Sequence, residues 1–85
     1  MWPFKRNRVL HVDDVNSIEL VLCALDEIGG VKKNSEWNVV GNVEINTFYY
    51  EVNGKKVTIS VENISGIEIV GEIETIKNLE RIIGK

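Results

Sequence analysis

The dipeptide Asn53-Gly54 constrains the fold of this chain more than any other feature of its sequence. A two-residue β-hairpin turn of type I′ needs positive φ angles at both central positions, and Asn followed by Gly adopts them at low steric cost. The flanking runs, residues 43–52 and 55–62, are rich in β-branched and aromatic residues. The sequence therefore predicts an antiparallel hairpin over residues 43–62.

A two-residue turn also fixes which residues of the two strands face each other. The expected pairs are Val52–Lys55, Glu51–Lys56, Tyr50–Val57, Phe48–Ile59 and Asn46–Val61. One face of the hairpin is then apolar, with Phe48, Tyr50, Val52, Val57, Ile59 and Val61. The other face carries Thr47, Tyr49, Thr58 and Ser60. This pattern predicts a half-buried hairpin that contributes one face to the core.

Two stretches have the periodicity of amphipathic helices. In residues 13–28 one stripe is apolar, and Asp13 or Asp14 can cap the first turn. In residues 72–83 the stripe consists of Ile73, Ile76, Leu79 and Ile83. Glycines follow both stretches, as expected at helix C-termini. We expect helices in both places.

The remaining strands are predicted at residues 37–40 and 67–70, with Gly41-Asn42 as a second tight turn. Residues 32–35 read as a polar connector, and residues 9–12 as a short extended segment at an edge. The prediction is a single α+β domain, residues 1–85. It has a four-stranded antiparallel β-meander, with an N-terminal and a C-terminal helix packed on the face that contains Trp37, Val39 and Tyr50.

The side-chain pattern around Gly41-Asn42 conflicts with a simple meander. A two-residue turn places Val40, Val43 and Ile45 on the face opposite to the predicted core. A β-bulge near residues 46–47 would return Val43 and Ile45 to the core side. Alternatively the sheet is apolar on both faces at this end, and a second copy of the chain covers the outer face. The sequence leaves both explanations open.

Net charge and hydropathy exclude several classes of function. The net charge is −3, and residues 57–76 contain no basic residue but four glutamates. An acidic chain of this kind is not expected to bind nucleic acid, because phosphate binding needs a basic face. No apolar run approaches the roughly 18 residues that span a bilayer, and residues 1–14 lack a signal-peptide pattern. We therefore predict a cytoplasmic protein.

The segment of residues 1–8 combines Trp2 and Phe4 with the cations Lys5, Arg6 and Arg8. Such a mixture can sit at a membrane interface, or its aromatic residues can dock on the fold or on a partner. Because eight residues that include a proline form no useful amphipathic helix, we do not expect membrane contact.

Few residues have the chemistry of a catalytic or metal site. His11, Asp13 and Asp14 include ligand types, but no second His or Cys supports them and both aspartates are explained as caps. Cys23, the only cysteine, lies in an apolar helical context and is expected as a small buried or flanking hydrophobic residue. The sequence contains no phosphate-binding loop and no nucleophile motif. We predict no catalytic residue, metal or cofactor.

The sequence thus favours a non-enzymatic protein–protein interaction module that self-associates as a dimer, through the uncovered sheet face or through an edge strand. The candidate interaction surface consists of Tyr49, Val40, Val43, Ile45, Glu68 and Glu72. Tyr49 is included because aromatic residues are enriched at interfaces, although its ring can also lie across its strand neighbours. The alternative is a ligand-binding or enzyme domain with a pocket bounded by Trp37, Tyr50 and the first helix.

Overall fold

A computed structural model describes residues 7–84. The elements are, in order, β1 (Asn7–Val12), a 3₁₀ turn η1 (Val15–Ser17), α1 (Ile18–Glu27), β2 (Val31–Val40), β3 (Val43–Val52), β4 (Lys55–Glu62), β5 (Gly66–Glu72) and α2 (Ile73–Ile83). The strands form one antiparallel sheet in the order β1-β5-β4-β3-β2. The α+β class with an antiparallel sheet and two helices is confirmed, whereas the predicted number of four strands is wrong because the sheet has five.

The central hairpin has the predicted register. Val52 pairs with Lys55, and the pairing continues without interruption to Ile45 and Glu62. The two turn residues have positive φ angles, 52° for Asn53 and 79° for Gly54, as a type I′ turn requires. The local chemistry of two residues therefore fixes the alignment of the two central strands.

The additional strand is β1, which pairs with β5 at one edge of the sheet. The predicted extended segment, residues 9–12, lies within it. Leu10 and Val12 pack against the core, while Val9 on the opposite face is 56% exposed. Of the predicted N-terminal segment, Asn7 and Arg8 belong to β1, and residues 1–6, with Trp2 and Phe4, lie outside the described residues.

At the other edge, β2 begins at Val31, so the predicted connector at residues 32–35 is wrong. These residues are polar yet extended, because a strand at the edge of a sheet needs no apolar side chains to pair its backbone. The register between β2 and β3 shifts between Lys32 and Asn34. The bulge thus lies in β2. Of the two explanations that the sequence left open for Val43 and Ile45, the one with a bulge near residues 46–47 does not apply, because the pairing of β3 with β4 is regular there.

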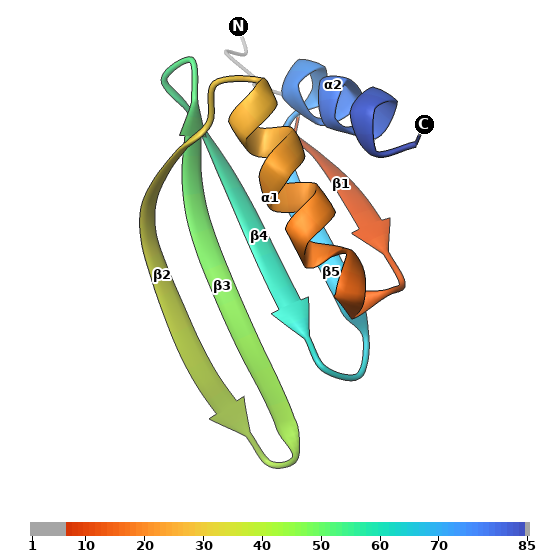
Figure 1. The fold of residues 1–85 in the computed structure, drawn as a ribbon. Coiled ribbons are helices and arrows are strands. Elements are labelled where there is room, and N and C mark those ends of the chain that lie inside the picture. Colours follow the sequence, from red (N-terminus) through yellow and green to blue (C-terminus); the bar gives the residue numbers. More distant parts are fainter. Residues whose placement is uncertain (1–6, 85) are drawn as a thin grey trace, which may run out of the picture.

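Both helices pack on the same face of the sheet (Figure 1). The Asp14 carboxylate accepts a hydrogen bond of 2.9 Å from the backbone N–H of Asn16, so the predicted cap forms on the 3₁₀ turn, and α1 begins only at Ile18. The fully buried side chains of the core come from α1, α2, β4 and β5: Val21, Ala24, Leu25, Val57, Ile59, Ile67, Ile69, Ile76 and Leu79. Neither helix is long and apolar enough to cross a membrane.

The β2–β3 hairpin extends beyond the end of α1 (Figure 1). We call its outer part, residues 36–47, the arm. Trp37 is 61% exposed and Val39 is 51% exposed, so their predicted burial under the helices is wrong. The radius of gyration of 12.9 Å exceeds the roughly 12 Å expected for a compact chain of this length, in agreement with a projecting arm.

Candidate interaction site

All ten residues of β2 are exposed, although the strand is paired with β3 along most of its length. It is the last strand of the sheet order, and no strand within residues 7–84 pairs with its outer edge. An edge strand presents a row of backbone N–H and C=O groups to its surroundings. The outer edge of β2 is therefore the main candidate for contact with another chain.

The backbone bonds of Glu44 reveal which groups of β2 point outward. Its N–H donates to Asn63 Oδ1 at 3.1 Å, and its C=O accepts from the Asn63 N–H at 3.3 Å, so the Glu44 backbone faces β4. Because these directions alternate along a strand, the backbones of Val43, Ile45 and Thr47 face β2. Their partners are Val40, Asn38 and Glu36. The residues in between, Ser35, Trp37 and Val39, direct their backbone groups outward.

The two halves of β2 differ in how the edge is protected. The first half contains the bulge, with Lys32 Nζ 5.6 Å from the centroid of the Phe48 ring and Lys33 Nζ 3.9 Å from Glu51 Oε1. Bulges and lysines are the devices by which proteins prevent edge pairing. The rest of the strand, residues 34–40, has neither, although the Ser35 N–H already donates to Asn34 Oδ1 at 2.8 Å. We call this part of the strand the open edge.

Side chains on the arm are held by hydrogen bonds across the strands. The Trp37 indole N–H donates to Glu44 Oε1 at 3.4 Å. On the opposite face of the sheet, the Tyr49 hydroxyl donates to Glu36 Oε1 at 2.8 Å. This bond and the negative charge of Glu36 raise the pKa of Tyr49 above its ordinary value. Glu36 is thus drawn toward β3, away from the outer edge.

The structure brings only part of the sequence-predicted surface together. Val40, Val43, Ile45 and Tyr49 share the face of β2 and β3 that lies opposite to the helices. Glu68 and Glu72 lie on β5, and β4 separates them from the other four. Glu72 forms an ion pair of 2.7 Å with Lys55 Nζ, whereas Glu68 is exposed.

Trp37 and Val39 were missed as surface residues, although the element lengths carry the signal. A ten-residue strand is about 33 Å long, and a ten-residue helix is about 15 Å long. Both β2 and β3 have ten residues, as does α1. A helix of that length leaves the end of such a hairpin uncovered.

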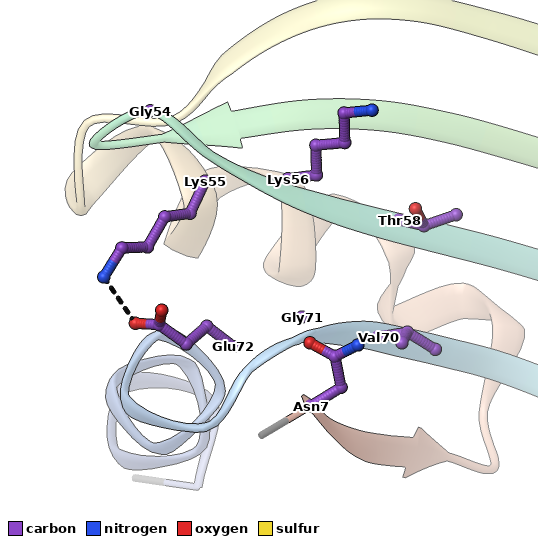
Figure 2. Close-up of a pocket in the computed structure, with 8 residues that line it drawn as sticks. All are labelled: Asn7, Gly54, Lys55, Lys56, Thr58, Val70, Gly71 and Glu72. Atoms are coloured by element: carbon purple, nitrogen blue, oxygen red, sulfur yellow. Dashed lines mark hydrogen bonds and ion pairs between the residues drawn. The ribbon is translucent and has the colours of Figure 1, made fainter. Parts of the chain in front are cut away.

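Two surface pockets lie near the Asn53-Gly54 end of the sheet. One, of about 350 Å³, lies where β4 and β5 diverge, and the Lys55–Glu72 ion pair bridges the two strands there (Figure 2). The other, of about 450 Å³, is lined by Lys33, Tyr49, Lys56 and, of the residues predicted to bound a pocket, Tyr50, among others. Neither pocket is lined by Trp37 or by a residue of α1.

The residues with ligand chemistry are dispersed. His11 Nε2 lies 2.9 Å from Asp13 Oδ1, while Asp14 caps η1. Within residues 7–84 no group of three or more His, Cys, Asp or Glu side chains is arranged to hold a metal ion. Cys23 is exposed on α1 and not buried, because it lies beside the stripe formed by Val21, Ala24 and Leu25.

Comparisons with protein-family models, with curated proteins and with solved structures find no match to this chain.

Proposed function

We propose that this chain is a non-enzymatic protein–protein interaction module that self-associates through the open edge of β2. The observation that carries the proposal is a strand exposed at every position, with Trp37, Val39 and Val40 on its unprotected half. Strand addition to such an edge gains main-chain hydrogen bonds, and the flanking side chains give specificity. A mildly acidic chain with this surface fits a cytoplasmic protein whose partners are proteins.

The open edge is favoured over the sheet face that contains Tyr49. That face is mixed in character, because Val43 and Ile45 are already half-buried and lie beside Thr47 and Ser60. The Tyr49 hydroxyl is engaged by Glu36. A partner on this face would gain little apolar area, whereas the edge offers both backbone groups and an exposed indole.

A pocket between helix and sheet has less support. The two pockets described above lie elsewhere, and Trp37, which was expected to form one wall, projects on the arm. We therefore do not propose ligand binding or catalysis for this chain.

The test is a comparison of two lysine substitutions at opposite edges of the sheet. Val39→Lys adds a charge beside the open edge, and Val9→Lys adds one on β1 at a similar exposure, 51% against 56%. We expect sedimentation velocity to show a monomer–dimer equilibrium for the natural chain and for Val9→Lys. Val39→Lys should remain monomeric to at least tenfold higher concentration.

Each other outcome contradicts the proposal. A natural chain that stays monomeric at millimolar concentration would refute self-association. A dimer that Val39→Lys leaves unchanged and that Tyr49→Glu disrupts would place the contact on the sheet face.

A further inference from the structure

We propose that the occupant of the open edge is a second copy of this chain, with the two β2 strands paired antiparallel about a two-fold axis at Trp37. The inference rests on the proposed self-association and adds the partner, the direction and the register. Pairing of the two β2 strands joins the two sheets into one continuous sheet, with all four helices on the same side. Four observations carry it: the outward backbone groups, the position of the bulge, the distribution of charge and the location of Glu36.

Charge decides the direction of pairing. Each β2 begins with Lys32 and Lys33, and the hairpin tip at its other end carries the exposed Glu44. Parallel pairing would place the lysines of both copies side by side, which is repulsive. Antiparallel pairing brings the basic start of each strand toward the acidic tip of its partner. The ends of the two strands are therefore complementary only in the antiparallel direction.

The backbone limits the possible registers. A two-fold axis perpendicular to the sheet requires that residues on the same face oppose each other, so the axis must lie midway between the two copies of one residue. Within the middle of the open edge the candidates are Glu36, Trp37 and Asn38. An axis at any of them sets outward groups opposite outward groups, but only an axis at Trp37 pairs Ser35, Trp37 and Val39 of one copy with the same three residues of the other.

The side chains select among these three registers. An axis at Glu36 sets two carboxylates directly opposite each other, which is destabilising. An axis at Asn38 restricts pairing within the open edge to residues 36–40. An axis at Trp37 pairs the whole of residues 34–40, with Glu36 opposite Asn38 and Ser35 opposite Val39. This register also stops before the bulge at Lys33, where the pairing of β2 with β3 is interrupted.

The Trp37 register also buries Trp37 itself, which is the most exposed apolar residue among those of β2 that lie on the same face as the helices. Two Trp37 rings meet across the axis, each held by its own Glu44. With 61% exposure, each ring has roughly 150 Å² available for burial. Pairing of one short strand from each copy still gives an interface below about 1,200 Å², so we expect a dimer that dissociates on dilution.

Disulfide trapping tests the register. Glu36→Cys and Asn38→Cys are each made in a Cys23→Ser background, because Cys23 is exposed. Opposed residues of a non-hydrogen-bonded antiparallel pair have Cα atoms about 4.5 Å apart, within the range of disulfides. Under mild oxidation an equimolar mixture of the two variants should form the 36–38 cross-linked dimer at least fivefold more than either variant alone.

The alternative outcomes are separable. Predominant cross-linking of Glu36→Cys alone, or of Asn38→Cys alone, would overturn the Trp37 register. A dimer in sedimentation that no cysteine pair cross-links would overturn edge pairing while self-association stands, and a chain that is monomeric throughout would refute both. Growth into longer assemblies would instead indicate pairing of β2 with the partner's β1, which leaves an unpaired edge at each end.

Amide hydrogen exchange provides a second measurement on the unmodified chain. In the monomer the N–H groups of Glu36, Asn38 and Val40 face β3, and those of Trp37 and Val39 point outward, whereas the Ser35 N–H already donates to Asn34 Oδ1 at 2.8 Å. We expect exchange at Trp37 and Val39 to slow at least tenfold between dilute and concentrated samples. Unchanged exchange at Trp37 in a sample that sedimentation shows to be dimeric would contradict the inference.

Discussion

Glu36 and Tyr49 show how a single hydrogen bond changes the role of two exposed residues. Tyr49 was selected from the sequence as an aromatic residue free to contact a partner. Its hydroxyl instead donates to Glu36 across the β2–β3 pair. The bond holds the Glu36 carboxylate over the sheet, so that its charge is kept from the edge where a second chain would approach.

The raised pKa of Tyr49 gives a direct test of this bond. Glu36→Gln removes the charge and keeps a hydrogen-bond acceptor, so the pKa of Tyr49 should fall toward its ordinary value of about 10. Ultraviolet titration of the phenol measures it, in a Tyr50→Phe background because burial also raises the pKa of Tyr50. Equal pKa values of Tyr49 with and without the Glu36→Gln substitution would show that the bond does not form in solution.

The sign of the accompanying pH dependence follows from linkage. The neutral phenol donates the bond, so the pKa of Tyr49 in the folded chain lies above that in the unfolded chain. The contribution of this group to stability is therefore fully present below about pH 10 and is lost as the pH rises through the folded value. Glu36→Gln should reduce that loss.

At the scale of elements, the sequence predicted what local chemistry determines. The Asn53-Gly54 turn set the β3–β4 register, and the apolar stripes located both helices. The prediction was incomplete at the two edges of the sheet, because residues 9–12 were expected to be extended but were not counted as a strand, and residues 32–35 were expected to be a connector. Residues 32–35 are polar and β1 is short, and edge strands pair through their backbones whatever their side chains are. Such strands carry little of the periodicity by which strands are recognised.

The candidate site was predictable only in part, for a related reason. The alternation of side chains correctly assigned Val40, Val43, Ile45 and Tyr49 to one face. It could not show that Trp37 and Val39, on the other face, lie beyond the reach of α1. Alternation assigns a residue to a face, but only a comparison of strand length with helix length indicates how much of that face a helix can cover.

Gly66 begins β5 and lies against the end of β1, so its replacement should reduce the stability of the fold more than replacement of Gly41. Its φ is +103°, and a Cβ atom there would lie 2.5 Å from the Val12 carbonyl oxygen at the end of β1. Gly41 also has a positive φ, +64°, but a Cβ atom there meets nothing within 4 Å. We expect Gly41→Ala to cost about 1–2 kcal/mol, from backbone strain alone.

Gly66→Ala also strains a backbone of positive φ, and in addition its Cβ atom must displace β1. Its loss of stability should therefore exceed that of Gly41→Ala by about 1 kcal/mol or more. Urea unfolding of the two variants measures the difference. Equal losses would mean that β1 can shift away from β5 at no cost, contrary to the pairing of Val12 with Ile67.

At the scale of the whole molecule, the order of the sheet separates one strand from the rest. Each pair among β2, β3, β4 and β5 consists of strands that follow each other in the chain. In contrast, β1 pairs with β5, and its partners lie 55 residues (Val12–Ile67) to 65 residues (Asn7–Glu72) further along the sequence. The loop-closure entropy of that pairing is therefore the largest in the sheet.

This topology implies an order in which the strands form during folding. Contacts between near neighbours in the chain form early, so we expect the four-strand meander to be built in the folding transition state and β1 to join afterwards. Leu10→Ala in β1 should then mainly accelerate unfolding, and Val57→Ala in the central hairpin should mainly slow refolding. Stopped-flow measurements in urea separate the two rates, and slower refolding of Leu10→Ala would contradict this order.

The strand that is added last would then govern how long the folded chain persists, while the hairpin at Asn53-Gly54 would govern how quickly it forms.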